Sequence, residues 1–209
     1  NNKENIKLIK KNYPRVATFS NIGDSYKEKY DGYIIASPAS THYSIAIDII
    51  NKGFNVLIEK PMTLNSENAK EIVKLANQNN VNVMVGHLLL FHPAIIKIKE
   101  LIDLGEIGKL QYIYSNRLNL GQIRTEENVF WSLAPHDISI LQYLTNSYPT
   151  HIECSGAAFI QNQIHDTTIT TLSYPDNIKA HIYLSWIHPF KEHRLVIIGS
   201  KGMLSFEDS

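Results

Sequence analysis

The sequence predicts an α/β fold in which a doubly wound parallel sheet is followed by an α+β domain with an open antiparallel sheet. Up to residue 87, short apolar runs alternate with segments that carry apolar residues at helical spacing, as in a parallel sheet with helices on both faces. Beyond residue 87, longer stretches of loosely alternating apolar and polar residues indicate half-buried antiparallel strands. We therefore expect a first domain at residues 1–88 and a second at residues 89–209.

The first half is expected to contain a strand–helix–strand unit. Residues 33–36 and 56–58 are short apolar runs typical of buried strands, and residues 43–51 carry a helical pattern that Gly53 follows as a cap. A unit of about 28 residues is long enough for one right-handed crossover. The neighbouring elements are expected to be a surface helix at residues 1–12, a short strand at 15–19, a helical turn at 25–30, a helix capped by Asn65 or Ser66, and a buried strand at 81–85.

The second half is expected to contain two helices and several longer strands. Residues 93–104 and 133–144 have helical patterns, and a polar loop at residues 122–128 precedes the second of them. Strands are expected at residues 109–120, 151–159, 167–174, 178–186 and 194–198, with a short last strand at 203–206. Because one helix layer cannot bury the large apolar residues on both faces of these strands, we expect a homo-oligomer that associates through the sheet.

The composition excludes several classes of protein. Lys plus Arg and Asp plus Glu number 20 each, so the basic footprint of a nucleic-acid-binding protein is absent. No apolar run reaches the roughly 18 residues of a membrane span, so no membrane segment is expected. No signal peptide is expected either, and we expect the protein to be cytoplasmic. Cys154 is the only cysteine, which excludes an internal disulfide and a cysteine-based zinc cluster. Because it lies in an expected strand, Cys154 is interpreted as an inert buried thiol.

Glu59, Lys60 and Pro61 directly follow the expected strand at residues 56–58. In an open α/β sheet, ligands bind beyond the carboxyl ends of the strands. Lys60 is therefore expected to point into a cleft, where burial lowers the pKa of a lysine and makes the amine a usable base. The alternative interpretation of the same three residues is a solvated entry into a loop.

Two segments at this spacing resemble the signature of one family. Residues 34–42 read Ile-Ile-Ala-Ser-Pro-Ala-Ser-Thr-His, Ala46 follows, and residues 53–61 read Gly-Phe-Asn-Val-Leu-Ile-Glu-Lys-Pro. The two motifs, in this order, are similar to those of the Gfo/Idh/MocA oxidoreductases, the group of glucose-fructose oxidoreductase and inositol dehydrogenase. The resemblance implies a partial Rossmann-type first domain, NAD or NADP as cofactor, and hydride transfer between nicotinamide and a secondary hydroxyl of a sugar. The glycine-rich cofactor turn of the family would lie upstream of Asn1, so the sequence is expected to be a fragment.

The resemblance also implies the catalytic and cofactor-binding residues. Lys60 is expected to take the hydroxyl proton, and His136 is expected at the start of its helix, against the substrate hydroxyl. A cis peptide is expected before Pro61. The residues expected to bind the cofactor follow the first two predicted strands: Ser37, Pro38, Thr41, His42, Glu59, Lys60 and Pro61.

Substrate-binding candidates come from the residues themselves. Arg117 and Asn119 are two apart, so they face the same side of a strand. Trp131 offers an apolar platform for a sugar ring, and a guanidinium such as that of Arg124 matches a diphosphate. The set of substrate-binding candidates is His87, Arg117, Asn119, Trp131 and Asp137. A nucleotide-linked sugar is favoured over a free sugar or inositol as the substrate.

Ser132 departs from the pattern of the family, which has an acid four residues before its histidine. Two alternatives therefore stay open: a non-catalytic binding or regulatory member of the fold, and an accessory subunit whose sheet serves only assembly. For His136 and Asp137, the alternative is a helix cap beside a surface histidine. No two histidines have the four-residue spacing of a zinc-binding helix, so no metal is expected.

Overall fold

The computed structural model describes residues 3–121, 123–125 and 127–208. Within them the chain forms two compact units. The first comprises residues up to 58 together with 65–84, and the second comprises residues 59–64 together with 85 onward. The α/β fold is confirmed: a parallel sheet is followed by a second, mixed sheet. The expected domain boundary at residue 88 stays a prediction.

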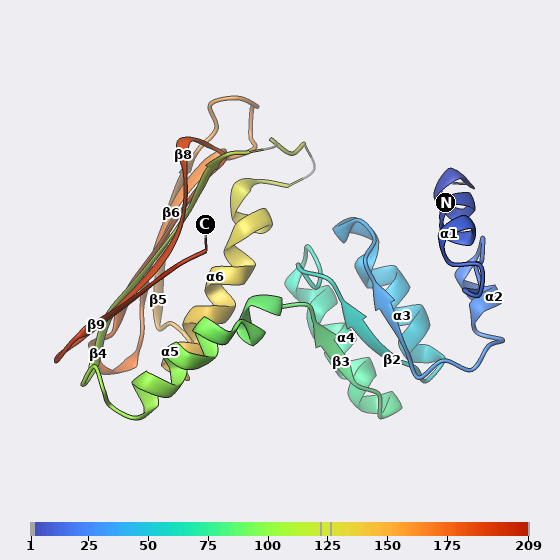
Figure 1. The fold of residues 1–209 in the computed structure, drawn as a ribbon, viewed down its shortest axis with the longest axis horizontal. Helices are drawn as coiled ribbons and strands as arrows, with labels where there is room; N and C mark the ends of the chain where they lie inside the picture. Colours follow the sequence, from blue (N-terminus) through green and yellow to red (C-terminus); the bar gives the residue numbers. More distant parts are fainter. Residues whose placement is uncertain (1–2, 122, 126, 209) are drawn as a thin grey trace. The chain divides into compact units, whose positions relative to one another are not determined.

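The first unit is built around three short strands in the order β1-β2-β3 (Figure 1). Strands β1 and β2 run parallel and are joined by α3, which is the strand–helix–strand crossover that the sequence predicts. The Asn65 side chain accepts a hydrogen bond from the amide of Glu67 (2.8 Å) and so caps α4. The elements are β1 (Gly32–Ile35), η1 (Ala39–Thr41), α3 (His42–Asn51), β2 (Asn55–Ile58), α4 (Ser66–Asn79) and β3 (Val83–Val85).

The segment before β1 differs from the expectation. It contains α1 (Lys3–Asn12) and α2 (Ile22–Ser25), but residues 15–19 are not a strand and the helical turn does not lie at 25–30. A strand needs backbone partners on a neighbouring strand, and the amide of Val16 instead bonds the carbonyl of Tyr13 in a turn. The turn at α2 comes early because the Asn21 side chain caps the amide of Gly23 (2.8 Å).

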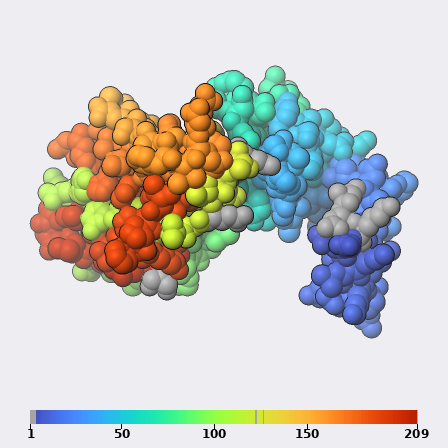
Figure 2. Space-filling view, turned by 90° about the horizontal axis from the view of Figure 1, so that it is seen from above, coloured from blue at the N-terminus to red at the C-terminus, as the bar shows by residue number. Residues whose placement is uncertain are grey.

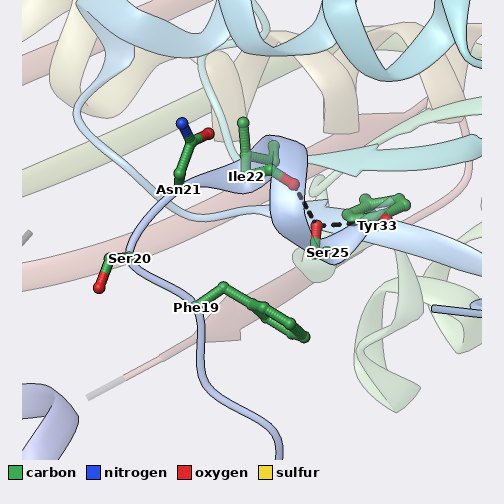
Figure 3. A pocket seen from close by; sticks show the side chains of 6 residues that line it. All are labelled: Phe19, Ser20, Asn21, Ile22, Ser25 and Tyr33. Atoms are coloured by element: carbon green, nitrogen blue, oxygen red, sulfur yellow. Dashed lines mark hydrogen bonds between the residues drawn. The ribbon is translucent and has the colours of Figure 1, made fainter. Parts of the chain in front are cut away.

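A hollow of about 600 Å³ lies beside α2 (Figure 3). The hydroxyl of Ser25 bonds the carbonyl of Ile22 (2.6 Å) and contacts the hydroxyl of Tyr33 (3.3 Å). The lining residues are Phe19, Ser20, Asn21, Ile22, Ser25 and Tyr33. None of the predicted site residues belongs to this hollow.

The second unit is a six-stranded sheet with two helices on one face (Figure 1). The strand order is β5-β6-β7-β4-β8-β9, and β4 pairs with β7 in parallel while the other pairs are antiparallel. The sheet is thus mixed rather than purely antiparallel. Its elements are η2 (Leu88–Phe91), α5 (Pro93–Asp103), β4 (Leu110–Leu120), α6 (Val129–Thr145), β5 (His151–Ala157), β6 (Thr167–Ser173), η3 (Pro175–Asn177), β7 (Lys179–Ser185), β8 (Ile187–Gly199) and β9 (Met203–Glu207).

The core of the second unit lies between the helices and one face of the sheet. Ile113, Ile182 and Ile197 on three neighbouring strands are fully buried, as is Leu141 of α6. The other face carries no helix, and Ile169 of β6 is half exposed. Buried and more exposed side chains thus alternate along these strands, as expected for a sheet that is covered on one face.

Two features of the second unit correct the sequence analysis. Helix α6 begins at Val129, where Asn128 caps the amide of Trp131 (3.0 Å), so His136 lies inside the helix rather than at its start. Cys154 is exposed rather than buried, because β5 is an edge strand whose residues are almost all exposed. Of the expected loop at residues 122–128, Gln122 and Glu126 lie outside the described residues.

Among the described residues, no helix combines the length and the apolar character that crossing a membrane requires.

Candidate active site

The turn after β1 brings together four of the predicted cofactor-binding residues. Ser37 Oγ lies 2.6 Å from Thr41 Oγ1, and the Thr41 hydroxyl donates to the carbonyl of Pro38 (2.7 Å). Because the Thr41 proton is used there, the Ser37 hydroxyl is the donor between the two side chains. His42 is buried, and its Nε2 lies 2.8 Å from the carbonyl of Ser37. These bonds close a turn at the carboxyl end of β1, the end where open α/β sheets bind ligands.

The segment after β2 belongs to the second unit and contains the remaining cofactor candidates. The peptide between Lys60 and Pro61 is cis, as expected. The carboxylate of Glu59 lies against Gly86, where an added Cβ would stand 3.2 Å from Glu59 Oε2. Because position 86 is a glycine, there is space beside it for the Glu59 carboxylate. Glu59 also accepts a hydrogen bond from the backbone amide of Lys60 (3.3 Å).

Lys60 reaches the backbone of α6. Its ammonium donates to the carbonyl oxygen of Ser132 at 2.8 Å. Burial lowers the pKa of Lys60 below its ordinary value, the carboxylate of Glu127 acts in the opposite direction, and the guanidinium of Arg124 lowers it further. The neutral amine is therefore easier to form here than on an exposed lysine.

His87 and His136 are the titratable neighbours of Lys60. Burial lowers the pKa of His136 to about 4, and the positive charges of Lys60 and Arg117 act in the same direction. Burial and the charge of Lys60 also lower the pKa of His87. Both imidazoles are therefore neutral at neutral pH, and each has one N–H group and one nitrogen lone pair.

Two buried nitrogen atoms near Lys60, Nδ1 of His87 and Nδ1 of His136, have no hydrogen-bond partner among the described residues. The buried Oδ1 atom of Asn119 on β4 also has no such partner. A buried polar atom normally has a partner, and one that lacks it requires a specific explanation. A ligand with several hydroxyl groups is such an explanation, since a hydroxyl both donates and accepts.

Arg117 and Asp137, two of the substrate-binding candidates, bind each other. Arg117 donates from Nε to Asp137 Oδ2 and from Nη2 to Oδ1, both at 3.2 Å. The hydroxyl of Ser115 donates to the same carboxylate (2.7 Å), whose side chain is 1% exposed. The pair therefore holds α6 against β4 next to His136. Their predicted substrate-binding role stays a prediction.

Trp131 and Arg124 are the more accessible candidates. Trp131 lies in the first turn of α6 and is 39% exposed. Arg124 forms an ion pair with Glu127 (2.8 Å). Glu127 and the carbonyl of Ser132 were missed by the sequence analysis. The only signal in the sequence is that Glu127 is a glutamate in a polar loop; Pro135 frees the helical carbonyl of Trp131, four residues earlier, and does not point to that of Ser132.

Two family models match the sequence. Residues 1–87 match the model described as an oxidoreductase family with an NAD-binding Rossmann fold, and residues 95–205 match the model of the GFO/IDH/MocA C-terminal domain. The chain belongs to the GFO/IDH/MocA oxidoreductase family. The resemblance and the Rossmann-type fold of the first domain, both predicted from the sequence, are thereby confirmed. The predicted nicotinamide cofactor is confirmed as NAD at the level of the family.

The curated relatives include enzymes with different named substrates. UDP-N-acetylglucosamine 3-dehydrogenase of Acidithiobacillus ferrooxidans is 28% identical over 67% of this chain and 44% of its own length. The scyllo-inositol 2-dehydrogenase (NAD(+)) of Bacillus subtilis is 28% identical over 83% of this chain and 54% of its own. The chain thus spans about half the length of the curated relatives that it matches.

Solved structures described as dehydrogenases have the same fold. A probable dehydrogenase from Thermotoga maritima superposes with a TM-score of 0.91 over 99% of this chain and 66% of that chain, at 17% identity. At this identity the likeness establishes the fold.

No three His, Cys, Asp or Glu side chains in the described ranges are placed to hold a metal ion together.

The depressed pKa of His136 predicts a loss of stability in acid. In the unfolded chain His136 has its ordinary pKa of 6.5, whereas in the folded chain the pKa of His136 is about 4. The unfolded state therefore binds more protons between these values, and the stability falls as the pH falls from about 6.5 to about 4. The thermal midpoint, measured by calorimetry across that pH range, should therefore fall as the pH falls. We expect this fall to be smaller in His136→Gln than in the parent. His151→Gln, at an exposed position on β5, is the control and should leave the pH dependence of the parent unchanged.

Proposed function

We propose that the protein is a nicotinamide-dependent sugar oxidoreductase with Lys60 as its acid–base residue. The observation that carries the proposal is the half-buried Lys60 amine beside two imidazoles with depressed pKa values. The catalytic, cofactor-binding and substrate-binding residues named from the sequence are part of this proposal. So is the division into a nucleotide-binding domain at residues 1–88 and a substrate domain from residue 89 onward.

The chain's own residues suit the proton step of alcohol oxidation. Bound nicotinamide supplies the acceptor for the hydride that leaves the hydroxyl-bearing carbon. The hydroxyl proton passes to the neutral amine of Lys60, and the carbonyl product retains the oxygen. Burial, which lowers the pKa of Lys60, makes the neutral amine accessible for this transfer. The hydrogen bond from Nζ to the carbonyl of Ser132 (2.8 Å) fixes the position of the amine.

His136 has the properties of a group that orients the substrate oxygen. As a neutral imidazole with an unpartnered buried Nδ1, it offers a hydrogen bond without adding a charge next to Lys60. The buried pair of Arg117 and Asp137 holds the helix that carries His136 against β4. We infer that His136 holds the substrate hydroxyl while Lys60 exchanges the proton.

Two local features support binding of the cofactor by the predicted residues. The turn after β1 is held closed by the bonds among Ser37, Thr41 and His42, so its backbone is pre-organised at the end of the strand. The Glu59 carboxylate has its place beside Gly86, where any side chain would crowd it. Glu59 is thus available to accept a hydrogen bond from a ribose hydroxyl.

We favour a nucleotide-linked sugar as the substrate, with a free sugar or inositol as the alternative. The unpartnered atoms of His87, Asn119 and His136 suit a ring with several hydroxyl groups. Trp131 offers an exposed ring face, and Arg124 offers a partly exposed guanidinium for a diphosphate. Relatives named for UDP-N-acetylglucosamine and for scyllo-inositol give support to both choices.

The alternative from another class is a non-catalytic binding or regulatory protein. It is favoured by one observation: Ser132, whose side chain cannot act as an acid, stands where the family pattern places one. Against it, the amine of Lys60 keeps a main-chain partner at that same residue.

Lys60→Ala should lower turnover by roughly 10²–10⁴-fold in the full-length protein, because that is the usual contribution of a general acid–base group. Steady-state rates of cofactor reduction measure the effect. Lys97→Ala is the matched control, since Lys97 is an exposed helix lysine paired with Glu100, and its removal should leave the rate unchanged. A Lys60→Ala enzyme with more than about half of the parent rate would exclude this role.

A panel of nucleotide sugars, free sugars and inositols tests the substrate. With NAD and with NADP, we expect the fastest cofactor reduction by a nucleotide sugar, because Arg124 can bind a diphosphate that the other compounds lack. Faster reduction by inositol or a free sugar would reject this choice and leave the oxidoreductase proposal intact.

We also propose a homo-oligomer that forms through the face of the six-stranded sheet opposite the helices. Within the described residues no helix lies on that face, and Ile169 on it is 51% exposed. A sheet face without a helix is stabilised when a second copy covers it. We expect light scattering at micromolar concentration to give at least the mass of a dimer and Ile169→Lys to weaken the association. A parent with the mass of one subunit contradicts the proposal.

A further inference from the structure

We propose that Gln161 is a positioning residue for Arg124, and that Arg124 binds the diphosphate of a nucleotide-linked substrate. Gln161 lies on the loop between β5 and β6, residues 158–166, which we call the β5–β6 loop. The inference deepens the proposed function and rests on it, because it takes a nucleotide-linked sugar as the substrate. Gln161 is bonded to the backbone of Arg124 and is assigned no contact with the substrate.

The guanidinium of Arg124 is held by one partner and is still accessible to a ligand. Its Nη1 atom donates to Glu127 Oε1 at 2.8 Å. The Arg124 side chain is 55% exposed, whereas that of Glu127 is 12% exposed. Because a guanidinium has five N–H groups, one bond to a carboxylate leaves further donors for a ligand. Those donors form a planar fork that matches the oxygens of a phosphate.

The bond to Glu127 also limits the movement of a long side chain. An exposed arginine has many rotamers, and ordering them when a ligand binds costs free energy. Arg124 is ordered in part before any ligand arrives, because its Nη1 atom already has a partner. A guanidinium held in this way loses less freedom when it binds a phosphate.

The backbone of Arg124 is held by the β5–β6 loop. Gln161 Nε2 donates to the carbonyl oxygen of Arg124 at 2.9 Å. Arg124 lies outside the helices and strands, so its carbonyl depends on a side-chain donor for the bond that regular secondary structure supplies elsewhere. Arg124 is therefore held at its carbonyl by Gln161 and at its guanidinium by Glu127.

The β5–β6 loop is itself fixed, so Gln161 has a defined position. Asp166 is fully buried, and its Oδ2 accepts from the amides of Phe159 (2.5 Å) and Ile160 (2.9 Å). The amide of Ile164 bonds the carbonyl of Gln161 (3.3 Å) and closes a short hairpin within the loop. A carboxylate that accepts two backbone amides forms charge-assisted bonds, which are stronger than neutral ones and hold the loop in place.

The same loop is bonded to the start of α6. The amide of Val129 donates to the carbonyl of His165 (3.0 Å), and the orange loop lies beside the yellow start of the helix (Figures 1 and 2). Ser132, whose carbonyl accepts from the Lys60 ammonium, follows Val129 by three residues, a rise of about 4.5 Å in a helix. Arg124 and Lys60 thus belong to the same end of α6. A substrate that carries both a diphosphate and the reacting hydroxyl requires this proximity.

A positioning role and a merely structural role of Gln161 predict different results. If Gln161 only fastens the loop, its removal should weaken the binding of a diphosphate equally with and without the Arg124 guanidinium. If Gln161 acts through Arg124, its removal should have no further effect once that guanidinium is gone. A double-mutant cycle separates the two cases, because it measures whether the two side chains act independently.

The experiment measures the binding of nucleoside diphosphates to the full-length protein by isothermal titration calorimetry. The protein is saturated with NAD, so that the probes do not enter the cofactor site, and the probes are UDP, ADP, GDP, CDP and dTDP. For the probe that binds the parent most tightly, we expect Arg124→Gln to weaken binding roughly 10–100-fold, the usual range for hydrogen bonds to a charged group. Gln161→Met, which removes one neutral hydrogen bond, should weaken it roughly 2–10-fold.

The control and the double variant complete the design. Gln163→Met is the matched control, because Gln163 is exposed on the same loop, and this variant should bind the probe as the parent does. The double variant, Gln161→Met with Arg124→Gln, should bind no more weakly than Arg124→Gln alone.

A loss of affinity in Gln161→Met that disappears in the Arg124→Gln background supports the proposal. An unchanged affinity in Gln161→Met, equal losses in both backgrounds, or a parent that binds none of the five nucleotides overturns it. If Gln161→Met does not fold, Gln161→Asn, whose amide is one methylene shorter, takes its place in the same cycle. The readout needs no turnover, so a failure here leaves the role of Lys60 intact, which the rate of Lys60→Ala tests separately.

Discussion

The hydrogen bond from the Lys60 ammonium to the carbonyl of Ser132 is the interaction on which the proposed site depends. It joins the segment after β2 to the first turn of α6, and the two residues are 72 positions apart in the sequence. Because the segment 59–64 is part of the second unit, Lys60 is positioned by the same helix that carries His136. Burial then gives this lysine a depressed pKa, which an exposed loop lysine does not have.

Several charged groups that act on Lys60 are paired with a group of opposite charge, as Arg124 is with Glu127 and Arg117 with Asp137. His87 and His136 are neutral near neutral pH, and the one fully buried carboxylate nearby, Asp137, is neutralised by Arg117. A buried ion pair of this kind contributes little net stability, but breaking it by removing one partner is costly. Its effect here is to hold α6 against β4 and thereby to fix the orientation of His136.

The mixed sheet explains why these side chains can meet. Strand β4 lies in the interior of the sheet, between β7 and β8, and contributes Ser115 and Arg117, which bind Asp137 of α6. A central strand is fixed by hydrogen bonds on both edges, so side chains on it have a well-defined position. No helix of the described residues lies on the opposite face of the same sheet.

The sequence by itself determined the features that local chemistry encodes. The strand–helix–strand unit around α3, the Asn65 cap and the place of Lys60 after β2 follow from periodicity, capping and order along the chain. Tertiary structure decided the rest. The parallel neighbour of β4, the Val129 start of α6 and the pairing of Arg117 with Asp137 depend on contacts between distant segments. Such contacts are selected by packing and loop closure over the whole unit, and no window of the sequence contains both partners.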